Sequence, residues 1–211
     1  APNCKNFIHF NIEDSEINKV VIGNHNVVGD CNKSVPLLYE YLNKNHNGIM
    51  TERLSWIETV QQWKMNHPFG HYKLENKIKT QDVLIELNKN LDKDYIITSG
   101  VGNHQMMSAQ FIDWRYPNRF HSSGSLGVMG AGLPYAIGTQ IGNKDKKVID
   151  IDGDSSFLMT LTDMKTIVEH DLPVKILLLN NGSQDMVRVW ETLFFEKRIT
   201  ATTNTRNPKF S

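Results

Sequence analysis

Three short apolar segments, with helical stretches between them, are the strongest constraint in this sequence. Strands are expected at Tyr95–Thr98, Lys147–Asp152 and Val174–Leu179. Helices are expected over Thr80–Leu91, which Thr80 caps, and over Leu161–His170. Apolar strands separated by helices of about 10 to 15 residues are typical of parallel strands buried on both faces. The pattern therefore predicts an α/β fold with a doubly wound parallel sheet.

The N-terminal segment has a weaker pattern of the same kind. Strands are expected over Phe7–Ile12 and Asn26–Asp30, followed by a helix over Val35–Leu42. Ser34 is a plausible cap for that helix, and Pro36 then falls in the first turn, where a missing N–H costs nothing.

A boundary is expected after this segment. Asn43–Gly48 is polar and has no periodicity, and Leu54–Met65 has apolar residues spaced three apart, as in an amphipathic helix. The chain is therefore divided into residues 1–44, a helical linker over residues 45–78, and a main domain over residues 79–211.

Composition excludes several classes of protein. The chain has 211 residues, with 23 Lys and Arg against 23 Asp and Glu, so a nucleic-acid or membrane-surface partner is not expected. Cys4 and Cys31 are too few for a disulfide framework or a four-thiolate zinc site, and we expect ordinary thiols in a reducing compartment. No apolar run approaches the ~18 residues of a membrane-spanning helix. The start at Ala1 has neither Met nor a signal-peptide pattern, which suggests a piece of a longer chain.

Two turns stand out because each directly follows a predicted strand. They are Gly153–Ser156 and Asn180–Ser183. In open α/β sheets ligands bind beyond the carboxyl ends of the strands, so Asp154 and Asn181 should emerge at one edge of adjacent strands. Carboxylate and amide oxygens, helped by a loop carbonyl, suit an octahedral divalent cation that also holds phosphate oxygens. Each sequence alone is also an ordinary turn; together they predict a metal-diphosphate anchor.

This pair of turns resembles the thiamine diphosphate signature, and the resemblance extends along nearly the whole chain. The similarity is to the large catalytic subunit of acetohydroxyacid synthase, also called acetolactate synthase. The segments that carry it are Ser99–Met106, Ser123–Pro134, Val148–Phe157, Leu172–Asn181 and Met186–Trp190. Phe157–Thr162 and Phe194–Arg198 resemble the fungal type, and the first forty residues resemble the end of that family's Rossmann-like, FAD-contacting middle domain. Residues 79–211 would then be a diphosphate-binding domain that is incomplete at its C-terminal end.

The resemblance implies roles for individual residues. The magnesium ligands would be the side chains of Asp154 and Asn181 and the backbone carbonyl of Ser183. The other expected contacts to thiamine diphosphate are Val101, Gly102, Asn103, His104, Gly127, Met129, Gly153, Ser155, Ser156 and Met186. Trp190 would position the substrate, and FAD would contact Asn11, Ile12, Asp30 and Cys31. From spacing alone, His104 could instead be a solvated cap, and Met129 and Trp190 could be ordinary packing residues.

The resemblance also implies a reaction. Such a subunit condenses two pyruvates, or pyruvate and 2-ketobutyrate, with loss of carbon dioxide, in branched-chain amino-acid biosynthesis. It uses thiamine diphosphate, Mg²⁺ and FAD. We expect a homodimer or homotetramer with the active site at the subunit interface, a possible regulatory small subunit, and a mitochondrial location if the source is eukaryotic, otherwise a cytoplasmic one. The family's essential glutamate lies in an N-terminal domain of a partner subunit, so no catalytic residue is assigned here, and this piece alone is expected to be inactive.

Four residues depart from the family pattern. Ser155 stands in place of Gly, Asn103 in place of Gln, Met107 where Trp is common, and Asp185 in place of Gly. Asp185 is the most serious departure because it adds a carboxylate near a phosphate. Two alternatives therefore stay open: a degenerate, non-catalytic paralogue that serves in assembly, and another thiamine diphosphate enzyme such as a pyruvate oxidase or glyoxylate carboligase.

Overall fold

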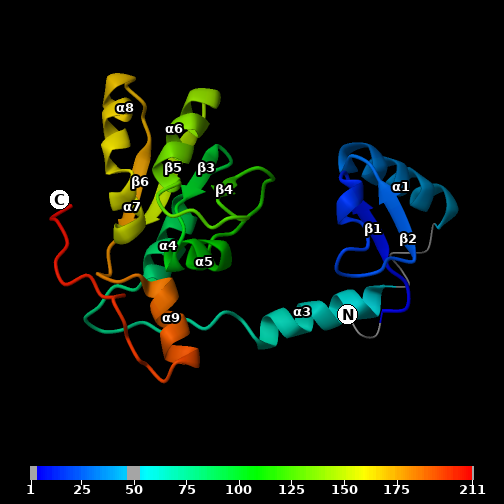
Figure 1. Cartoon of the computed structure of the whole chain (residues 1–211), viewed down its shortest axis with the longest axis horizontal. Coiled ribbons are helices and arrows are strands. Elements are labelled where there is room, and N and C mark those ends of the chain that lie inside the picture. Colours follow the sequence, from blue (N-terminus) through cyan, green and yellow to red (C-terminus); the bar gives the residue numbers. More distant parts are fainter. Residues whose placement is uncertain (1–3, 47–52, 211) are drawn as a thin grey trace. The chain divides into compact units, whose positions relative to one another are not determined.

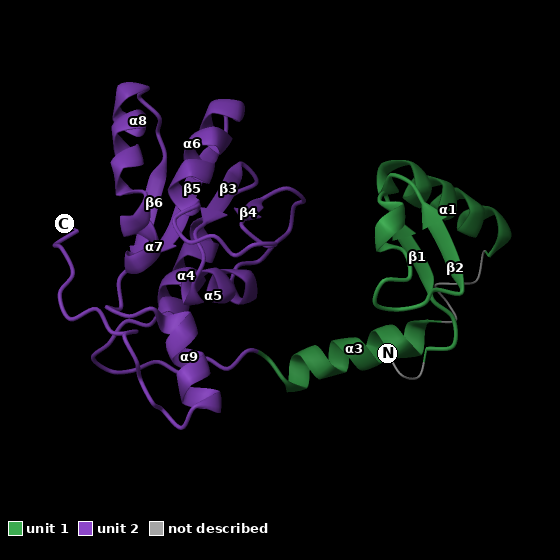
Figure 2. Cartoon of the chain, viewed as in Figure 1, with its two compact units in different colours: residues 1–68 green, residues 69–211 purple. Residues whose placement is uncertain are grey.

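The computed structural model describes residues 4–46 and 53–210. The chain divides into two compact units, residues 1–68 and residues 69–211 (Figure 2). Each unit is described by itself below.

The described residues of the first unit, 4–46 and 53–68, form a two-stranded parallel sheet and two long helices. β1 (Ile8–Asn11) pairs with β2 (His25–Val28), and the short 3₁₀ helix η1 (Asp14–Glu16) follows β1. α1 (Cys31–Asn45) follows β2, and α3 (Leu54–Asn66) ends the unit (Figure 1). Both strands and both helices lie where the sequence predicts them. Of the polar stretch Asn43–Gly48, residues 47 and 48 lie outside the described residues.

The start of α1 differs from the prediction. The cap is Asp30, whose Oδ1 accepts a hydrogen bond from the Asn32 N–H at 2.8 Å. Ser34 therefore lies inside the helix, where its hydroxyl donates to the Asp30 carbonyl at 3.3 Å, and Pro36 lies beyond the first turn. Asp is as strong an N-cap as Ser, and the Asp that comes first after β2 begins the helix.

The second unit is built on a four-stranded parallel sheet. β3 (Tyr95–Ser99), β4 (Phe120–Ser122), β5 (Lys147–Gly153) and β6 (Lys175–Leu179) are arranged in the order β4-β3-β5-β6. All three pairings are parallel, which confirms the predicted α/β fold with a parallel sheet. The chain leaves β3 outward to β4 and then returns past β3 to β5. The direction therefore reverses between β3 and β5, and ligands of α/β proteins bind at such a reversal.

Helices connect and cover these strands. α4 (Thr80–Asn90) leads into β3, and α5 (Asn103–Phe111) packs against α4 and β5. α6 (Gly132–Gly142) packs against β3 and β5 (Figure 1). α7 (Asp154–Met159), η2 (Leu161–Asp163) and α8 (Met164–Glu169) join β5 to β6, and α9 (Asp185–Phe194) follows β6.

Three local expectations need correction. Lys79, not Thr80, is the N-cap of α4, and its N–H donates to Asp82 Oδ2 at 3.0 Å. The helix expected over Leu161–His170 is split into η2 and α8. Neither α6 nor β4 was predicted: α6 begins in a Gly-rich stretch, which disfavours helix on propensity, and β4 is only three residues long.

The core lies between the sheet and its helices. Leu84 of α4, Ile97 of β3, Leu133 of α6 and Ile151 of β5 are all fully buried. In the described parts of the chain, no helix is long and apolar enough to cross a membrane.

Two glycines of α6 allow a matched test of this packing. A Cβ at Gly132 would lie 2.5 Å from the Gly100 backbone nitrogen and 2.7 Å from Asp150 Oδ1, whereas a Cβ at Gly138 would meet nothing within 4 Å. We expect Gly132→Ala to lower the free energy of unfolding by at least about 2 kcal/mol, because backbone cannot yield to the added methyl. Gly138→Ala should raise it by about 0.5 to 1 kcal/mol. Urea denaturation measures both values, and equal effects would contradict the packing.

Candidate functional site

A pocket of the second unit lies at the carboxyl ends of β3, β5 and β6. It has a volume of about 700 Å³ including its open mouth, within the usual range for small-molecule sites. Its lining contains all thirteen residues expected to contact thiamine diphosphate. The other lining residues are Thr80, Leu179, Gln184, Asp185 and Val187. Residues from the turns after β3, β5 and β6 and from the loop that carries Gly127 and Met129 thus meet in one cavity.

Strand register sets the relative position of two of these turns. Gly153 at the end of β5 pairs with Leu179 at the end of β6. Asp154 and Asn181 therefore leave adjacent strands at the same edge, as the sequence predicts. Asn181 Oδ1 accepts a hydrogen bond from the Ser183 N–H at 3.1 Å, which closes the turn after β6.

The first residues of α4, α5, α7 and α9 all line the pocket. Asn103 is the first residue of α5 and Asp185 the first of α9. The first N–H groups of a helix lack intrahelical acceptors, and that end of the helix carries a partial positive charge. The pocket can therefore receive an anionic group such as a diphosphate.

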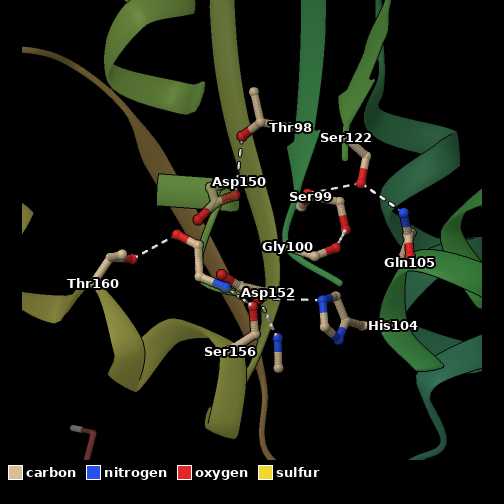
Figure 3. A network of polar contacts seen from close by, with 12 residues as sticks. Thr98, Ser99, Gly100, His104, Gln105, Ser122, Asp150, Asp152, Ser156 and Thr160 are labelled. Carbon is tan, nitrogen blue, oxygen red and sulfur yellow. Dashed lines mark hydrogen bonds and ion pairs between the residues drawn. The ribbon is translucent and has the colours of Figure 1, made fainter. Parts of the chain in front are cut away.

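His104 is enclosed at the back of the pocket. Its side chain is 8% exposed, and Nε2 lies 3.1 Å from Asp152 Oδ1 (Figure 3). A Cβ at Gly102 or at Gly153 would lie 2.7 Å from the imidazole ring. Two glycines thus make room for His104, and the burial of its side chain contradicts the alternative of a solvated cap.

The Asp154 carboxylate has features suited to a metal ligand. It is 1% exposed, and within the described residues no Lys or Arg pairs with it. Asn204 Nδ2 and Asn207 Nδ2 donate to its Oδ2 at 2.9 Å and 2.5 Å. Its charge is therefore not neutralised by a cationic side chain. Together with the Asn181 amide and the nearby loop carbonyls, these oxygens fit Mg²⁺, and the cavity and the helix starts fit a diphosphate.

Two of the residues that depart from the family pattern contact each other. Asn103 Nδ2 donates to Asp185 Oδ2 at 2.6 Å, which links the start of α5 to the start of α9. The carboxylate of Asp185 also lies in the first turn of α9, where negative charge is favourable. Asp185 thus has a structural role in the pocket wall.

The loop that carries Gly127 and Met129 is attached to α7. The Gly130 N–H donates to Ser156 Oγ at 2.9 Å, and Thr160 Oγ1 donates to the Gly130 carbonyl at 2.8 Å (Figure 3). Gly130 has φ +79°, in the left-handed region that glycine adopts most readily. These contacts fix one end of the loop beside Asp154.

A buried acid lies behind the pocket on β5. Asp150 is fully buried, and its Oδ1 accepts a hydrogen bond from Thr98 at 2.9 Å (Figure 3). Burial raises the pKa of Asp150 to about 7, and the neighbouring Asp152 adds to this effect, whereas the hydrogen bond from Thr98 opposes it.

Several predicted site residues lie elsewhere. Trp190 of α9 does not line the pocket; it is 57% exposed and its ring lies 5.1 Å from that of Phe194. The four residues expected to contact FAD belong to the first unit. There Asn11 Oδ1 accepts from the Glu13 N–H, Asp30 caps α1, Ile12 is 71% exposed and Cys31 is an exposed free thiol.

The pocket residues fall within a region that matches a known family. Residues 100–211, just over half of the chain, match the model for the C-terminal TPP binding domain of thiamine pyrophosphate enzymes. The chain belongs to the thiamine pyrophosphate enzymes. This match confirms the predicted family of the cofactor-binding domain.

Curated relatives identify which of these enzymes the chain resembles. The mitochondrial acetolactate synthase catalytic subunit of Saccharomyces cerevisiae is 41% identical over 208 residues, which is 96% of this chain and 29% of the relative. The mitochondrial acetolactate synthase of Schizosaccharomyces pombe is 42% identical over 96% of this chain and 30% of its own length. The isozyme 2 large subunit of Escherichia coli is 35% identical over 100% of this chain and 36% of its own. The resemblance to acetolactate synthase catalytic subunits, fungal ones included, is confirmed. The chain spans about a third of the length of these relatives.

The buried acid on β5 predicts a dependence of stability on pH. An unfolded Asp has its ordinary pKa of 3.8, so between that pH and about 7 only the unfolded state releases this proton. The free energy of unfolding should therefore fall by a few kcal/mol as pH rises through this range. Asp150→Asn should remove that part of the slope, as measured by urea denaturation from pH 4 to pH 8. The exposed Asp145→Asn is the control, and identical slopes for the wild type and Asp150→Asn would contradict the prediction.

Proposed function

We propose that this chain is the diphosphate-binding part of an acetolactate synthase catalytic subunit. The parent enzyme condenses two pyruvates, or pyruvate and 2-ketobutyrate, with loss of carbon dioxide. The observation that carries the proposal is the convergence of all thirteen expected cofactor contacts in one pocket. The identity to acetolactate synthases across nearly the whole chain supports the same assignment.

Each part of the pocket wall has a role in this proposal. Asp154, Asn181 and the backbone carbonyl of Ser183 hold Mg²⁺, while the segment Val101–His104 binds the diphosphate. Gly127 and Met129 contact the rings of thiamine diphosphate, and Met186 lies on α9 over the active site. When bound, the cofactor supplies the electron sink for decarboxylation of a 2-keto acid. The residues of this chain bind and orient the cofactor and exclude water from it.

The remaining expectations form part of the same proposal. Residues 1–44 are the end of a central domain that contacts FAD through Asn11, Ile12, Asp30 and Cys31, residues 45–78 are a linker, and residues 79–211 bind the diphosphate. Trp190 positions the substrate.

The enzyme is a homodimer or homotetramer with a regulatory small subunit, and a partner subunit supplies the essential glutamate. A mitochondrial location is proposed because the two fungal relatives are mitochondrial by name.

The hypothesis of a degenerate, non-catalytic paralogue is weakened by the contacts of Asp185. That hypothesis has two motives, the charge of Asp185 and the glutamate that the resemblance places in another domain. The structure bears on the first, because the Asp185 carboxylate is hydrogen-bonded to Asn103 at 2.6 Å. Asp185 is therefore accommodated by the pocket wall.

Product formation tests the reaction. The full-length parent protein, supplied with pyruvate, Mg²⁺, thiamine diphosphate and FAD, should release 2-acetolactate, and removal of Mg²⁺ with a chelator should abolish this product. Asp154→Ala should lower the rate by at least about 100-fold, because loss of a residue that only hydrogen-bonds to a metal ligand already lowers activity by up to about 100-fold. The exposed Asp145→Ala is the matched control. No 2-acetolactate from the cofactor-loaded wild type would refute the proposal, and assays with 2-ketobutyrate and glyoxylate would identify the related reactions.

Cofactor affinity tests the role of Asp185. Asp185→Asn keeps a polar partner for Asn103 but removes a negative charge from the pocket, so it should tighten binding of Mg²⁺ and thiamine diphosphate on the order of 10-fold. Asp185→Ala removes the charge and the link to α5 together and should gain less. Isothermal titration measures each dissociation constant, with Asp145→Asn as the charge-matched control. Weaker binding by Asp185→Asn would show that the carboxylate contributes to the site.

A further inference from the structure

A C-terminal strap, defined here as residues 200–207, runs beside the turn that follows β6. The Gln184 N–H donates to the Thr202 carbonyl at 2.8 Å, and the Asn204 N–H donates to the Gly182 carbonyl at 2.8 Å. Ser183 Oγ also donates to the Thr202 carbonyl, at 2.9 Å. These bonds join the strap to the backbone of the same turn that carries Asn181.

The beginning of the strap is anchored on α9. Glu191 is 9% exposed, and its Oε1 accepts from the Thr200 N–H at 2.8 Å. Its Oε2 accepts from the Thr202 hydroxyl at 2.7 Å, and Thr202 is 3% exposed. A buried carboxylate with both oxygens bonded to the strap holds it in place.

The strap delivers two amide side chains to one oxygen atom. Asn204 Nδ2 donates to Asp154 Oδ2 at 2.9 Å and to Ser155 Oγ at 2.8 Å. Asn207 Nδ2 donates to the same Oδ2 at 2.5 Å and to Asn180 Oδ1 at 3.0 Å. An amide nitrogen carries two hydrogens, and in Asn204 and Asn207 alike both hydrogens are donated. The reverse orientation of either amide would turn its carbonyl oxygen toward a carboxylate, which fixes the assignment of donor and acceptor.

The two oxygens of Asp154 therefore have different surroundings. Oδ2 carries two hydrogen bonds, whereas none of the described residues donates to Oδ1, and Asp154 lines the pocket. We propose that Asn204 and Asn207 are positioning residues that hold Oδ2 against the strap and present Oδ1 to the divalent cation. This inference depends on the proposed function, because it concerns the same metal site.

The chemistry of the two donors supports this role. A carboxylate that is 1% exposed needs hydrogen-bond partners to remain charged. Lys or Arg would supply such partners but would also neutralise the charge that attracts the cation. Two neutral amides satisfy the oxygen and leave the negative charge available. Partners of this kind orient metal ligands in many sites and are worth about 10- to 100-fold in metal affinity.

Direct metal binding tests the inference without an activity assay. The full chain, with thiamine diphosphate present, is titrated with Mn²⁺ as a paramagnetic substitute for Mg²⁺, and free Mn²⁺ is measured by electron paramagnetic resonance. Asn204→Ala and Asn207→Ala should each raise the Mn²⁺ dissociation constant about 10-fold, and the double variant should approach 100-fold. Asn207→Leu keeps the size of the side chain but has no donor, so it should match Asn207→Ala. The exposed Thr205→Ala, between the two amides, should bind Mn²⁺ like the wild type.

The results separate the inference from the function on which it depends. Melting of the metal-free variants by circular dichroism reports whether each one folds, and either single variant that folds decides the question. Unchanged Mn²⁺ affinity would overturn the positioning role while leaving the proposed function intact. Tighter binding would also overturn it, because the amides would then compete with the metal. A wild type that binds no Mn²⁺ with thiamine diphosphate would remove both proposals.

Discussion

The parallel pairing of β5 with β6 is the interaction on which the site depends. Register aligns Gly153 with Leu179, so the turns that carry Asp154 and Asn181 leave the sheet together. A shift of one residue would send every side chain of β6 to the opposite face of the sheet, and the buried strands would lose their packing. The hydrophobic core therefore fixes the spacing of the polar groups at the edge. The same contacts therefore set both the stability of the sheet and the spacing of Asp154 and Asn181.

Features with a local physical cause could be predicted from the sequence. The strands β3, β5 and β6 are short apolar runs, and the turns after them contain residues suited to an edge site. Features that depend on competition or tertiary contact could not. α6 forms despite its glycines because Gly132 lets it approach the Gly100 backbone, a contact that no propensity reveals. The N-cap of α1 is Asp30 and not the predicted Ser34, because both residue types are good N-caps and the sequence does not rank them.

The same distinction holds within the pocket. Asp154 and Asn181 could be predicted because each belongs to a turn that directly follows a strand. Asn204 and Asn207 were missed because they contact Asp154 from 50 and 53 residues away, in a segment with no periodicity. The bond from Asn103 to Asp185 spans 82 residues, and the sequence shows only two polar residues there. Considered alone, the Asp185 carboxylate is expected to weaken diphosphate binding. Its hydrogen bond from Asn103 makes it part of the pocket wall.

The charges of the pocket constrain how a cofactor can enter it. Asp154 and Asp185 both line it, and none of the described lining residues is Lys or Arg. On the proposed function, a bare diphosphate would face two carboxylates with only helix starts and His104 to attract it. Each helix start is worth about 0.3 to 1 kcal/mol, which is less than a close charge repulsion in a half-buried site. A divalent cation reverses this balance because it is attracted to Asp154 and to the phosphate oxygens at once. On the proposed function, the metal and the diphosphate therefore bind as a coupled pair, and any residue that orients Asp154 acts on the affinity of both.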